Sequence, residues 1–218
     1  MKKYISTFLV AVLCLGLSVS AGATNTATNS QGLTEDNIKH VETIFQNKAL
    51  IVDENGTDVT NTFIEENRDR YQAGDYNAIL DCLIDQNLAI EEQVPVSLPE
   101  TRLVVNGAVN SSRITRYFDS PLTGTTTKEW ITFYFTGHYR VNDYSNTIDS
   151  GVKVDGVTTA KSSSSLTKLC GITSSSWKIS NNNKKITFTV KYSARIFTSP
   201  HVIADKQDGT TTFSKTLS

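Results

Sequence analysis

A row of polar and aromatic residues on one expected β-strand has the most capacity for chemistry. Residues 129–144 alternate, so Ile131, Phe133 and Phe135 share one face and the residues between them point outward. Aromatic, hydroxyl and cationic groups can stack on a sugar ring or a peptide and hydrogen-bond to its edge. The pattern predicts a ligand-binding face made of Trp130, Thr132, Tyr134, Thr136, His138 and Arg140, with Tyr144 beyond it.

Two features decide whether this face is open. A strand of this length would span about 50 Å, so we expect a bend, and Gly137 is the natural site for a β-bulge that would swap the facing of later residues. The alternative is that acidic helices or a second sheet cover the face, because large exposed apolar patches are uncommon on monomers.

His138 raises the question of catalysis. With Cys170 or a nearby serine as nucleophile and Asp143 as orienting carboxylate, it would form a hydrolase-like triad. No local signature of such a site accompanies these residues, so the sequence favours a histidine without a catalytic role. His40 and His201 have no close cysteine or histidine partner, so the sequence predicts neither a zinc site nor a cofactor.

The run 53–58 has the acidic character of a calcium loop. It lacks the glycine at the sixth position of that loop, and Ile64 stands where the bidentate acid should be. A polar turn around Asn55-Gly56 explains the run better, so no metal is predicted there. The sequence also contains no glycine-rich phosphate loop.

The first residues predict export. Lys2 and Lys3 precede an apolar run, 5–19, and Ala21-Gly22-Ala23 supplies the small residues that a signal peptidase requires. We therefore expect a cleaved signal peptide of bacterial style, residues 1–23, and a secreted, extracellular protein. No later apolar stretch is long enough for a membrane span of about 20 residues.

Two cysteines remain after such a cleavage, Cys82 and Cys170. An oxidising compartment permits one disulfide between them, which would stabilise the fold by about 4–5 kcal/mol in the chain-entropy model. The alternative is a pair of buried, unpaired thiols that act as small apolar residues.

Charge divides the mature chain into two regions. Residues 24–100 carry a net charge of −11, whereas residues 101–218 carry +8. The basic region would attract an anionic ligand, but docking of the acidic region on it is the simpler expectation. The prolines Pro95 and Pro99 mark the junction. Whether the acidic region is a removable pro-region or a docked part of the fold stays open at this point.

The acidic region has helical patterns. Thr34 is placed to cap a first helix, a second begins near Thr60 or Asn61 and ends at Gly74, and Asp75 caps a third. A short strand over 49–52 is expected between the first two helices.

The basic region has the period of β-strands, most clearly over 129–144 and 184–198. Pairs such as Asn106-Gly107, Asp155-Gly156 and Asp208-Gly209, and the run 181–183, predict turns. The fold class is therefore α+β, an acidic helical region before an antiparallel β-sandwich or open barrel. The other expected strands are 102–106, 108–118, 148–154, 157–160, 166–172, 176–181, 201–206 and 210–216.

These observations favour a secreted, non-catalytic protein that recognises a surface glycan, a peptide or a protein through a β-sheet face. One alternative is a toxin or bacteriocin-like effector, because the strands 129–144 and 184–198 alternate as membrane-crossing β-hairpins do. A secreted hydrolase is the other alternative. No nucleic acid is expected as a partner, because the basic residues are scattered and no stacking motif accompanies them.

Overall fold

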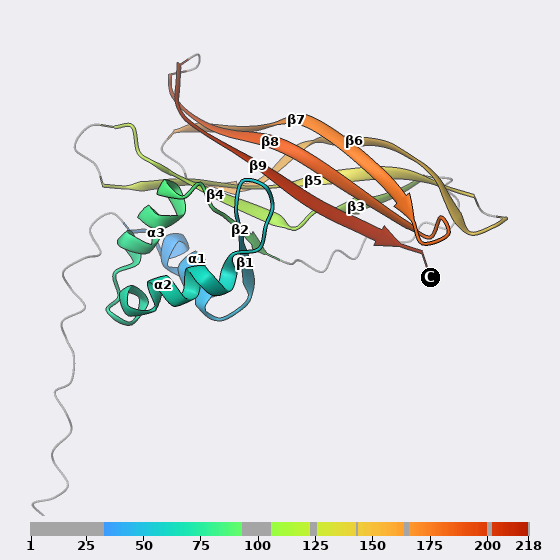
Figure 1. Ribbon diagram of the computed structural model, residues 1–218. Coiled ribbons are helices and arrows are strands. Elements are labelled where there is room, and N and C mark those ends of the chain that lie inside the picture. Colours follow the sequence, from blue (N-terminus) through green and yellow to red (C-terminus); the bar gives the residue numbers. More distant parts are fainter. Residues whose placement is uncertain are drawn as a thin grey trace, which may run out of the picture.

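The computed structural model describes residues 33–92, 106–122, 126–142, 144–163, 166–199 and 202–217; the predicted leader, Pro95 and Pro99 lie outside these ranges. The described residues form three helices in the N-terminal part and two antiparallel sheets, neither of which closes into a barrel (Figure 1). The α+β fold class expected from the sequence is confirmed.

The first and third helices begin where the sequence places their caps, and the second ends before the predicted glycine. Thr34 Oγ1 accepts a hydrogen bond from the Asn37 N–H at 3.3 Å, and the Asp75 carboxylate accepts one from the Ala78 N–H at 3.3 Å. Gly74 adopts φ +71° after the second helix, a conformation that glycine takes without strain. The helices are α1 (Glu35–Phe45), α2 (Thr60–Gln72) and α3 (Tyr76–Asp85).

Nine strands form the two sheets. Sheet A contains β1, β2, β4 and β5 in that order; β3 and β4 pair with successive parts of β5, while β6 pairs along the other edge of β5. Sheet B has the order β7-β8-β9. The strands are β1 (Ala49–Val52), β2 (Ala89–Glu92), β3 (Asn106–Asn110), β4 (Arg113–Asp119), β5 (Lys128–Asn142), β6 (Thr147–Ser162), β7 (Thr167–Ser180), β8 (Lys185–Ser199) and β9 (Val202–Thr216).

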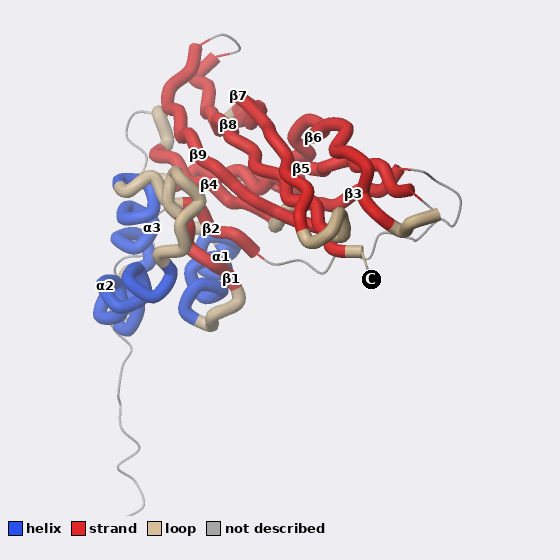
Figure 2. Tube along the Cα trace, turned by 45° about the vertical axis from the view of Figure 1, so that its right-hand side comes forward, coloured by secondary structure: helices blue, strands red, loops and turns tan. Residues whose placement is uncertain are grey.

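Sheet A lies between two apolar cores. On its inner face, Ile131, Phe133 and Phe135 join Phe188 and Tyr192 of sheet B in one buried cluster. On its outer face, residues such as Tyr117 and Trp130 pack against all three helices in a second cluster. The helices therefore cover part of one side of sheet A, and sheet B covers the other side (Figure 2).

Several glycines predicted to form turns lie inside strands. Asp208-Gly209 is in the middle of β9, Asn106-Gly107 begins β3, and Asp155-Gly156 lies within β6, so these three predictions are wrong. At Gly209 the reason is close packing, because a Cβ there would lie 2.1 Å from Arg116 Nη2. The turn at 181–183 is confirmed, and its three asparagines all have positive φ.

The acidic region docks on the β domain, as the charge split predicts. Its strand β2 pairs with β4, so both regions contribute to sheet A. Two ion pairs accompany the apolar contact: Lys128 of β5 binds Asp81 of α3, and Lys161 of β6 lies 2.6 Å from Asp36 of α1. Burial alone would lower the pKa of Lys128, but the hydrogen-bonded Asp119 and Asp81 carboxylates raise it.

Candidate functional site

The candidate site is the uncovered part of the outer face of sheet A. We call this surface the open face: Tyr134, Thr136, His138 and Arg140 of β5, with Asn110 of β3 and Lys153 and Asp155 of β6. Along β5, every residue from Lys128 to Phe133 is buried, whereas the four residues of the open face are half-buried or exposed. We call these parts the buried end (Lys128–Phe133) and the open end (Tyr134–Asn142) of β5.

Polar contacts within and between strands hold several groups of the open face. Thr136 Oγ1 donates to Asn110 Oδ1 at 2.8 Å. The Asp155 carboxylate lies 2.5 Å from His138 Nε2 and 2.6 Å from Lys153 Nζ. The hydrogen bond from Lys153, followed by the charge of His138, lowers the pKa of Asp155. The surface thus presents donors and acceptors in set positions on a strand that is paired on both edges.

The structure places the residues predicted for the binding face in different environments. Trp130 is only 1% exposed, so the expectation that it faces solvent is wrong, and the alternative of a covering helical layer is correct at that position. Its ring meets the His40 ring edge-on at 5.0 Å. Tyr134 and His138 are half-buried and Arg140 is exposed. Tyr144 is fully exposed in the turn that follows β5.

Gly137 does not form the expected bulge. It pairs in regular register with Val109 and with Val154, and the facing of β5 continues unchanged through it. A Cβ at Gly137 would lie 2.7 Å from the Phe188 ring, so the glycine admits a close approach of sheet B. The register shifts of this strand pair place the extra residues on β6 instead.

Cys82 and Cys170 are free thiols, so the disulfide that the sequence permits is not formed. Cys82 packs beside the helical cluster, whereas Cys170 packs against the core between the sheets. Burial raises the pKa of the Cys170 thiol to about 12, despite the nearby Arg116 and Arg195. Both thiols are unpaired, as in the alternative, but they are half-buried rather than buried, and Cys82 Sγ accepts a hydrogen bond from Arg70 Nη1 at 2.7 Å.

Cys170 and His138 of the hydrolase-like triad are not brought together. Cys170 pairs with the buried Ala194 and faces the core between the sheets, whereas His138 lies on the opposite side of sheet A. The carboxylate beside His138 is Asp155; Asp143 and His201 lie outside the described residues. His40 instead accompanies Trp130, and its Nδ1 lies 2.6 Å from the Tyr117 hydroxyl.

The run 53–58 forms the predicted polar turn. The Asp53 carboxylate accepts hydrogen bonds from the Asn55 and Thr57 N–H groups, each at 2.8 Å. The bond from Thr57 is the main reason why the pKa of Asp53 is lowered. Across the described residues, no group of three histidine, cysteine, aspartate or glutamate side chains is arranged to hold a metal ion. Nor does any helix in the described ranges have the length and apolar character that a bilayer crossing needs.

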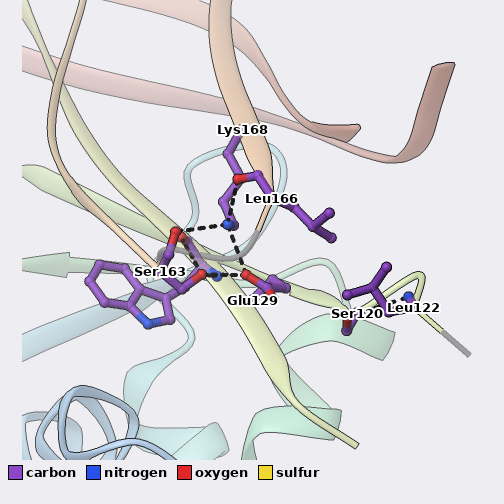
Figure 3. Close-up of polar contacts among 7 residues, drawn as sticks. Ser120, Leu122, Glu129, Ser163, Leu166 and Lys168 are labelled. Carbon is purple, nitrogen blue, oxygen red and sulfur yellow. Dashed lines mark hydrogen bonds and ion pairs between the residues drawn. The ribbon is translucent and has the colours of Figure 1, made fainter. Parts of the chain in front are cut away.

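Sequence reasoning missed a buried ion pair at the buried end of β5. Lys168 Nζ lies 2.8 Å from Glu129 Oε2 and donates to the Ser163 and Leu166 carbonyls, each at 2.9 Å (Figure 3). Ser163 Oγ donates to the same Glu129 oxygen at 2.6 Å. The three donors of the Lys168 ammonium are thereby used, and the cluster fixes the connection between β6 and β7 onto β5.

The buried hydrogen bonds of Arg116 were missed as well, although the position of this residue in its strand indicates them. It alternates with Ile114 and Phe118, so it occupies a core position of β4. Its guanidinium donates to the Tyr192 hydroxyl at 2.9 Å, to the Asp208 carbonyl at 3.2 Å and to the Asn87 carbonyl at 2.8 Å. Burial raises the pKa of Tyr192 to about 12, and that of Glu91 nearby above its usual value. Arg116 therefore joins the helical region to both sheets.

Comparison with known proteins adds no relative: no protein-family model matches the chain, and no curated protein or solved structure shows a significant match.

Proposed function

We propose that the protein is an exported, non-catalytic binding protein that recognises a surface glycan through the open face. The observation that carries this proposal is the array of half-buried and exposed polar groups on β5, in which Thr136 is held by Asn110 of β3 and His138 by Asp155 of β6. A rigid array costs little conformational entropy when a ligand binds, and this favours recognition.

The chemistry of the array suits a polyhydroxylated ligand. Tyr134 offers one aromatic ring, Arg140 offers a planar donor, and Asn110 and Asp155 offer amide and carboxylate oxygens. Sugar hydroxyls both donate and accept, so they match such a mixed set, while an apolar peptide side chain would gain little there.

The expected compartment agrees with this role. The leader pattern of residues 1–23 favours secretion, and glycans of cell surfaces are reached from outside the cell.

A glycan array tests the proposal. We expect the protein to bind a subset of neutral glycans, and Tyr134→Ala and Arg140→Ala each to weaken that binding by about tenfold, as loss of a central contact does. Arg68→Ala is the matched control, since Arg68 is an exposed arginine on α2.

Two outcomes would contradict the proposal. Glycan binding that survives both substitutions unchanged would show that another surface is used. Binding restricted to a parallel peptide array would replace the glycan by a peptide ligand. Circular dichroism of each variant confirms that the fold is retained.

A further inference from the structure

The outward face of sheet B is a second surface, of a different composition. Cross-strand register places its side chains in four rows of three, while the intervening Ile186, Phe188 and Val190 are fully buried. We call these twelve residues the hydroxyl face. The rows are Ser180–Lys185–Thr216, Lys178–Thr187–Ser214, Ser176–Thr189–Thr212 and Ser174–Lys191–Thr210.

The hydroxyl face contains nine serine or threonine residues, three lysines and no acid. All twelve side chains are exposed or half-exposed. Four of them lie on β8, which is paired on both edges, and four lie on each of its neighbours β7 and β9, so the face follows the register of the sheet. Lys185 and Lys191 are six residues apart on β8, which separates them by roughly 20 Å at the usual rise of a strand.

The positive charge of this face is not compensated within the described chain. Residues 166–217 contain eight lysine or arginine residues and two aspartates, a net charge of +6. In the ranges that the structure covers, Lys178, Lys185 and Lys191 take part in no ion pair. The one acid in the adjoining row, Asp208, lies 2.8 Å from Lys206.

The helices of the acidic region do not cover the face. The polar turn 53–58 touches only its last row, where a Cβ on Gly56 would lie 2.8 Å from the Thr210 carbonyl oxygen. Among the described residues no ion pair joins that turn to a lysine of the face. The helices pack on the outer side of sheet A, and sheet B lies on the inner side, so its outward face points away from them (Figure 1). Docking of the acidic region therefore leaves the three lysines of this face without an ion pair among the described residues.

We propose that the hydroxyl face binds an extended acidic polysaccharide, a chain whose sugars carry carboxylates. Lysine ammonium groups pair with the carboxylates, and the serine and threonine hydroxyls between them exchange hydrogen bonds with the sugar hydroxyls. Charges spaced along a straight strand suit a polymer with charges spaced along its length, because each added contact acts at high effective concentration.

The composition favours this occupant over two other anionic surfaces. The twelve residues include no aromatic ring on which a nucleic-acid base would stack. They include no apolar side chain that would enter a lipid bilayer. The face offers hydroxyl and ammonium groups. These are the groups that bind the hydroxyls and carboxylates of an acidic glycan.

Binding to polygalacturonate, with its fully methyl-esterified form as the uncharged comparison, tests this inference. We expect binding to polygalacturonate that weakens between about 50 mM and about 300 mM salt. The esterified polymer should bind at least about tenfold more weakly, because its carboxylates are blocked. The triple variant Lys178→Gln, Lys185→Gln, Lys191→Gln should lose binding by a similar factor, roughly tenfold for three exposed ion pairs.

A charge-matched variant separates local contacts from net charge. Lys39→Gln, Lys48→Gln and Arg68→Gln remove the same charge from exposed positions of the acidic region and should leave binding within about twofold. Tyr134→Ala should also leave it unchanged, which distinguishes this face from the open face.

Three results would overturn the inference: equal binding of the esterified polymer, unchanged binding by the triple lysine variant, or tighter binding to polyphosphate, single-stranded DNA or phosphatidylglycerol vesicles than to polygalacturonate. Absence of binding to neutral glycans would contradict only the proposal for the open face. The two proposals can therefore be tested independently.

Discussion

The buried end and the open end of β5 belong to one strand and have the same alternation of side chains, yet they differ in what covers them. At the buried end, helices cover the outer face, and Trp130 is 1% exposed. At the open end the inner face is still dry, since Phe135 and Tyr139 are buried, but His138 and Arg140 meet solvent. The strand sets the side to which a residue points, and neighbouring layers decide whether it serves stability or recognition.

The largest expected difference between the two ends is in free energy of unfolding. Trp130→Ala should lower it by about 3–5 kcal/mol, since the substitution leaves a cavity between helix and sheet. Tyr134→Ala, on the same face of the open end, should cost about 1 kcal/mol or less. Urea denaturation of both variants measures the contrast. Equal losses would mean that the two ends are covered alike.

Breaking an ion pair should likewise cost more stability at the buried end than at the open end. Glu129→Gln leaves the Lys168 ammonium buried without its carboxylate, so we expect a loss of about 3 kcal/mol. Asp155→Asn, at the exposed pair with Lys153, should cause no measurable loss.

A double variant provides the control for the Glu129 prediction. Glu129→Gln combined with Lys168→Met removes both charges and should recover much of the lost stability. Urea denaturation measures both steps, and a double variant as unstable as the single one would refute the charge explanation.

Acid should destabilise the buried end through His40. Burial lowers the pKa of His40 to about 4, with Asp36 raising it and Lys161 and Lys39 lowering it. The unfolded chain binds the proton near pH 6.5 and the folded chain does not. The free energy of unfolding should therefore fall by roughly 2–3 kcal/mol as pH drops from about 6.5 to about 4.

His40→Gln removes this titration and gives the comparison. As the pH falls through that window, the difference in unfolding free energy between the protein and the variant should shrink. Urea denaturation at each pH measures both free energies. Parallel pH profiles would show that His40 does not titrate as proposed.

The sequence predicts what depends on local chemistry. The caps at Thr34 and Asp75 and the asparagine turn at 181–183 follow from short-range preferences, and all are confirmed. The alternation of β5 also correctly assigns Phe133 and Phe135 to the core.

The errors arise where distant segments meet. Gly137 and Gly209 look like a bulge site and a turn, but they make room for Phe188 and Arg116, which come from other strands. The burial of Trp130 likewise depends on His40, 90 positions earlier in the chain. Such contacts leave no local pattern in the sequence. Arg116 is an exception, because a charged residue at a core-facing position of a strand indicates a buried polar contact.

The ladder between β2 and β4 has a consequence for proteolysis. Cleavage of the chain between residues 92 and 106 would break one peptide bond and leave that ladder, the apolar contacts of the helices and the Arg116–Asn87 hydrogen bonds in place. The two fragments should therefore travel as one particle through a sizing column, and the N-terminal piece would act as a complementing subunit of the fold.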